Sequence, residues 1–91
     1  MKLCKSDVAL CKEYCRSLEE VDQREKGLNF INEIQSMINA WDCWPRNGYL
    51  VPKNGLKNNH VAYIISNLGL FNDPTIGCKV TEGSSVAFIK K

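Results

Sequence analysis

The stretch LNFINEIQSMINAW, residues 28–41, carries the clearest structural signal in the chain. Its large apolar side chains recur at intervals of three or four residues. They are Phe30, Ile31, Ile34, Met37, Ile38 and Trp41. This spacing puts them on one side of an α-helix, which predicts a helix with one buried face.

A second amphipathic helix is expected before it, over residues 6–24. Its apolar stripe contains Leu3, Leu10, Cys11, Tyr14, Leu18 and Val21. Gly27 is expected to end this helix, because glycine is the commonest residue just past a helix C-terminus. Two amphipathic helices joined by a short break predict an antiparallel helical hairpin, in which each helix covers the other's apolar side.

The rest of the chain predicts one further helix and three short strands. In chain order these are a strand at 49–51, a helix at about 57–68 that Asn58 can cap, and strands at about 76–81 and 86–90. The last two strands are separated by a connection of hairpin length. The predicted fold class is therefore α+β: an antiparallel helical hairpin, then a short strand, a helix and a C-terminal β-hairpin, in a single domain over residues 1–91.

The C-terminal half of the chain resembles the winged-helix family in the order of its elements. The matching segments are HVAYIISNLGLF at 60–71, TIGCKV at 75–80 and SVAFIKK at 85–91. They correspond to a helix, its closing Leu-Gly-Leu turn and a β-hairpin wing. The match is incomplete, because a winged helix has a further helix between its first strand and its wing, and residues 52–57 are too few for one. The resemblance implies a small nucleic-acid-binding regulator.

Charge is distributed unevenly along the chain and supports the same hypothesis. Residues 1–45 carry six Lys/Arg and eight Asp/Glu, whereas residues 46–91 carry six and two. The segment RNGYLVPKNGLKNNH at 46–60 has no acid. Cations attract phosphates, and Asn side chains can bond phosphates or base edges. Together with the C-terminal hairpin, the predicted nucleic-acid-binding residues are Arg46, Lys53, Lys57, Asn58, Asn59, His60 and Lys79. The alternative is a polar loop whose Asn residues serve turn geometry.

A different function class fits the same composition. Trp44 does not continue the apolar stripe of residues 28–41, and Tyr49 follows it closely. Trp, Tyr and Arg dominate the energetics of protein interfaces, so Trp44 and Tyr49 are candidate interface residues. The protein would then be a small inhibitor or adaptor that blocks a larger partner without catalysis. The alternative for Trp44 is a lid over the helical hairpin.

Catalytic patterns are nearly absent. His60 is the one histidine, so any Ser/His/Asp or Cys/His arrangement would have to use it. The glycines are scattered, and no phosphate-binding glycine loop occurs. We therefore expect no enzymatic activity, no cofactor and no metal.

Five cysteines are many for a chain of 91 residues. Buried packing of reduced thiols is the expectation, with a disulfide or a metal site at Cys11 and Cys15 as alternatives. No segment has the roughly 18 consecutive apolar residues of a membrane span. Residues 1–20 contain no uninterrupted apolar stretch of the signal-peptide kind. The expectations are no membrane partner and a cytoplasmic protein with reduced thiols.

Overall fold

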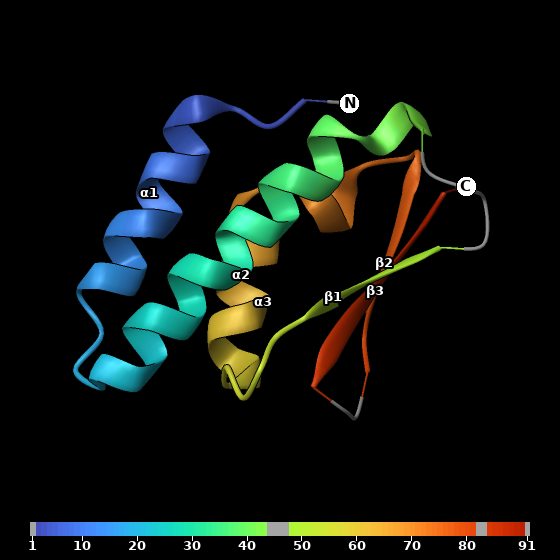
Figure 1. Ribbon diagram of the computed structural model, residues 1–91. Coiled ribbons are helices and arrows are strands. Elements are labelled where there is room, and N and C mark those ends of the chain that lie inside the picture. The colour runs from blue at the N-terminus through green and yellow to red at the C-terminus, as the bar shows by residue number, and fades with distance from the viewer. Residues whose placement is uncertain (1, 44–47, 82–83, 91) are drawn as a thin grey trace.

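The computed structural model describes residues 2–43, 48–81 and 84–90. Its elements follow the predicted order and confirm the α+β class. They are α1 (Lys5–Arg16), α2 (Val21–Asn39), the 3-10 turn η1 (Trp41–Cys43), β1 (Tyr49–Pro52), α3 (Asn58–Asn67), the 3-10 turn η2 (Leu70–Asn72), β2 (Ile76–Val80) and β3 (Ser85–Lys90). Helices α1 and α2 run antiparallel, as Figure 1 shows, and form the predicted helical hairpin.

The three strands form one antiparallel sheet in the order β1-β3-β2. The helices lie on one side of this sheet, and none of the elements in the described residues lies on its other side (Figure 1). Val86 pairs with Val51 on one side and Val80 on the other. Because side chains alternate between the faces of a strand, Val86 and Phe88 of β3 both point toward the helices, where they are buried.

The core forms between this inner sheet face and the apolar stripe of α2. The stripe predicted for residues 28–41 is confirmed, since all six of its apolar side chains are buried. Trp41 is the last of them, and the Nζ of Lys90 lies 5.4 Å from the centroid of its ring. The cation therefore covers the aromatic side chain at the edge of the core.

The boundary between the first two helices differs from the prediction. Helix α1 ends at Arg16, and α2 begins at Val21. The side chain of Arg24 stabilises the connection, because it donates hydrogen bonds to the carbonyl oxygens of Leu18 and Glu19. Leu18 and Glu19 belong to the connection between the two helices, so these bonds tie the connection to α2. The predicted stripe of the first helix is correspondingly shorter, and both Leu10 and Val21 are exposed.

Gly27 does not end a helix, contrary to the prediction, but lies inside α2. A Cβ atom at this position would lie 2.6 Å from the Sγ of Cys15 and 3.3 Å from its Cβ. Cys15 is fully buried, so its sulfur has little room to move. Gly27 is therefore required for the close approach of α1 to α2, and not for a special backbone conformation.

We expect Gly27→Ala to lower the free energy of unfolding by about 1 kcal/mol. The substitution removes the roughly 1 kcal/mol helix penalty of glycine, but overpacking a core typically costs about 1–3 kcal/mol. Urea denaturation measures the difference. In a Cys15→Ala background the sulfur is gone, so the same substitution should be neutral or stabilising. An equal loss in both backgrounds would contradict the packing role of Gly27.

Candidate functional site

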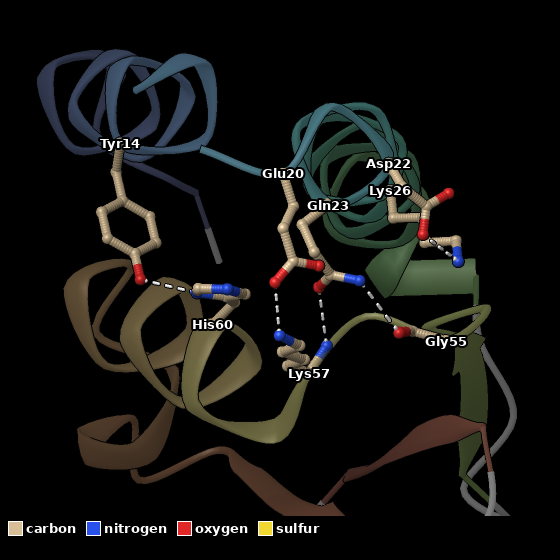
Figure 2. A network of polar contacts seen from close by, with 8 residues as sticks. All are labelled: Tyr14, Glu20, Asp22, Gln23, Lys26, Gly55, Lys57 and His60. Carbon is tan, nitrogen blue, oxygen red and sulfur yellow. Dashed lines mark hydrogen bonds and ion pairs between the residues drawn. The ribbon is translucent and has the colours of Figure 1, made fainter. Parts of the chain in front are cut away.

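The start of α3 collects most of the residues predicted to bind nucleic acid. Lys57 occupies the N-cap position, and Asn58, Asn59 and His60 form the first turn. Lys57 and His60 face the connection between α1 and α2, as Figure 2 shows. The Nδ1 atom of His60 lies 2.7 Å from the hydroxyl oxygen of Tyr14, at hydrogen-bond distance. This contact holds His60 to α1.

Lys57 is held to the same connection by two contacts. Its Nζ lies 2.6 Å from Oε1 of Glu20, and both side chains are exposed. Its backbone amide donates a hydrogen bond of 3.0 Å to Oε1 of Gln23. The Nε2 of Gln23 donates in turn to the carbonyl oxygen of Gly55, at 3.3 Å. Gln23 is buried, so one side-chain amide joins α2 to the turn that precedes α3.

Lys53 is not exposed, contrary to the expectation that it contacts phosphates. Only 6% of its surface is accessible, and its Nζ donates a hydrogen bond to Oδ1 of Asn58. The cause is its position two residues after the buried Val51, since alternate residues of an extended chain face the same side. Asn58 accepts this bond and does not cap α3, which has no side-chain cap.

The remaining predicted residues lie elsewhere. Lys79 is exposed on β2, opposite Ala87 of β3, on the side of the sheet that faces away from the helices. Tyr49 of β1 is half-buried and pairs with Phe88. Arg46 and Trp44 lie outside the described residues. The structure therefore brings Lys57, Asn58, Asn59 and His60 together and places Lys79 on a different surface.

The outer face of the sheet has an apolar surface that the sequence analysis missed. Leu50 is 58% exposed and pairs with Ala87, and Ile89 is 46% exposed and pairs with Gly77. A shallow hollow of about 560 Å³ lies over this face. It is lined by Gly48, Tyr49, Leu50, Ala87 and Ile89. The signal was present in SVAFIKK, where inward Val86 and Phe88 require Ala87 and Ile89 to point outward.

The five cysteines are free thiols that differ in burial, and Cys78 of β2 is half-buried. Cys11 and Cys15 are fully buried core residues, as expected, and burial raises the pKa of Cys11 to about 11. Cys4 and Cys43 are exposed. Hydrogen bonds from the Ser6 hydroxyl and from the backbone lower the pKa of the Cys4 thiol. Within the part of the chain that the structure describes, His, Cys, Asp and Glu side chains form no group of three suited to hold a metal ion.

Comparison with known proteins adds no functional assignment. No protein-family model, curated protein or solved structure matches this chain. The winged-helix resemblance therefore concerns the order of elements alone. Among residues 2–43, 48–81 and 84–90, no helix combines the length and the apolar content needed to cross a membrane. Function must be argued from the surfaces of the chain itself.

We expect Gln23→Leu to lower the free energy of unfolding by about 1–3 kcal/mol. The substitution removes the two hydrogen bonds that Gln23 makes with the amide of Lys57 and the carbonyl of Gly55, and one such bond typically contributes about 0.5–1.5 kcal/mol. Urea denaturation with Asn32→Leu as the control tests this, because Asn32 is exposed on the same helix. Equal stability of the two variants would show that Gln23 does not hold α3 in place.

Proposed function

We propose that this protein is a non-catalytic protein-binding module that docks a partner on the outer face of its sheet. The observation that carries the proposal is the exposed apolar surface formed by Leu50, Ala87 and Ile89. One face of an antiparallel sheet commonly meets water and is then polar. Contiguous exposed apolar side chains at such a place typically mark an interaction site.

The register of the strands makes this surface continuous. Leu50 lies directly across from Ala87, and Ile89 is the next outward residue of β3. Diagonal neighbours in a sheet are close enough for long side chains to touch. The same strand carries the buried Val86 and Phe88, which fix it to the core. A surface ordered in advance loses little conformational entropy when a partner binds.

The face of the sheet suits docking better than its β1 edge. The amide of Lys53 donates to the carbonyl of Ser84, at 2.6 Å. Hydrogen-bonded positions alternate along an antiparallel strand, so the backbone groups of Leu50 and Pro52 point to the outer edge. Pro52 has no N–H to donate there, and such residues disfavour the addition of a further strand.

The charge beside the surface indicates the kind of partner. Lys79 is exposed next to Ala87 on this face. A partner that offers apolar side chains together with a carboxylate opposite Lys79 would complement it in shape and in charge. Tyr49 pairs with the inward Phe88 and packs against the core, so its aromatic ring belongs to the inner face and does not contribute to this surface.

The double variant Leu50→Thr/Ile89→Thr tests the docking surface. Both side chains are largely exposed and threonine suits strands, so the free energy of unfolding should change by less than about 1 kcal/mol. The matched control is Leu10→Thr/Val21→Thr, which removes as much exposed apolar surface from the helical side. Quantitative affinity capture from the source cells should show partners that the control retains and the sheet variant loses.

Identical capture by the two variants would contradict the proposal. Light scattering on the purified protein distinguishes one further outcome. If the wild type forms a dimer that the sheet variant does not form, the surface binds a second copy and the proposed heterologous partner is wrong.

Nucleic-acid binding at the start of α3 is the second candidate. The observation that favours it is the exposure of the Lys57–Glu20 ion pair. Exposed ion pairs contribute about 0–1 kcal/mol, so a phosphate could displace Glu20 at small cost. Exposed Asn58 and Asn59 adjoin Lys57 and could add hydrogen bonds to the same backbone.

Glu20→Gln distinguishes this candidate from the first. The substitution removes the carboxylate that neutralises Lys57, so affinity for nucleic acid should rise about two- to fivefold if Lys57 contacts phosphates. Fluorescence anisotropy with duplex DNA, single-stranded DNA and RNA at two salt concentrations measures the change. The control is Glu33→Gln, on a different part of α2. If neither Glu20→Gln nor Glu33→Gln binds any of the three nucleic acids at low salt, nucleic-acid binding is contradicted.

A further inference from the structure

A groove separate from both surfaces lies where the segment before α1 meets the C-terminal half of α2. Its volume is about 240 Å³. Leu3 and Val8 line it from the N-terminal side, and Ile38 lines it from α2. Val8 and Ile38 belong to the buried core, and Leu3 packs against that core. The groove is therefore backed by firmly held apolar side chains.

The polar groups of the groove are cationic or neutral. Lys2 and Lys5 line it and are exposed, and Gln35 and Asn39 add side-chain amides. None of the described residues that line the groove is acidic. Asp7 of α1 is near in sequence but is not part of the lining. Lys5 begins α1, so the positive end of that helix dipole lies nearby, while the C-terminus of α2 contributes the opposite sign. These two partial charges oppose each other, so Lys2 and Lys5 make the net charge around the groove positive. The groove therefore favours an anion.

We propose that this groove binds a small amphiphilic carboxylate, with its alkyl chain against Leu3, Val8 and Ile38 and its carboxylate at Lys2 and Lys5. Ligand sites typically combine a mainly apolar lining with a few polar groups that orient the ligand. At roughly 30 Å³ for each water-sized group, the volume holds about eight such groups. A straight-chain carboxylate of medium length fits that space.

Titration of the labelled full chain with octanoate, followed by methyl NMR, tests the site. The methyl signals of Leu3, Val8 and Ile38 should shift together, with a dissociation constant on the order of 1 mM for a ligand of about ten heavy atoms. Octylammonium has the same chain and the opposite charge, and acetate has the charge without the chain. Neither should shift these signals at the same concentrations.

The variant Lys2→Gln/Lys5→Gln should weaken octanoate binding about fivefold, as expected for two exposed ionic contacts. The matched control Lys12→Gln/Arg16→Gln removes the same charge at positions outside the groove and should leave binding unchanged. Three results would each overturn the proposal: no shift with octanoate, equal shifts with octylammonium, or the same loss of affinity in both variants. Methyl signals of the core residues Ile31 and Ile64 report whether each variant is folded.

Discussion

Coverage of only one face of the sheet is the constraint on which the rest of this structure depends. In the described part of the chain, the helices α1, α2 and α3 all lie on the same side of the three-stranded sheet. Among residues 2–43, 48–81 and 84–90, no element forms a second layer on the other side of the sheet. The inner face therefore holds the core, and the outer face meets the surroundings. Leu50 and Ile89 make that outer face apolar, and the proposed docking surface rests on this property.

The helical layer in turn depends on two close contacts made by α2. Because Gly27 has no side chain, α1 approaches α2 closely, and Cys15 of α1 occupies the space that a side chain at residue 27 would need. Gln23 holds the turn before α3 through one donor and one acceptor. These contacts bring Lys57 to Glu20, and His60 of the same helix start bonds Tyr14. Much of the polar segment at 53–60 thus serves to dock α3, which lowers the number of cations left for a polyanionic ligand.

Local patterns in the sequence predicted the helices and strands. They could not predict contacts between residues that are far apart in the sequence. The 3.6-residue period predicted the part of α2 that follows residue 27, although residues 21–24 were assigned to the first helix. Gly69 marked the end of α3, where its φ is 76°. The prediction that Gly27 ends a helix was wrong, because glycine is required there by the contact with Cys15 on another helix. The pairing of Lys57 with Glu20 joins residues 37 positions apart, which no local pattern shows. The burial of Lys53 and the exposure of Ile89 were accessible from strand alternation, once the strand bounds were known.

Solvent paramagnetic relaxation on the isolated protein tests the central claim most directly. A soluble nitroxide broadens the methyl signals that it can approach, so it reports which apolar side chains are open in solution. An open outer face predicts strong broadening at Leu50 and Ile89 and little at Ile31 and Ile64, at every protein concentration. Protection of Leu50 and Ile89 in dilute solution would mean that the outer face is already covered, and it would contradict a sheet surface open to a partner.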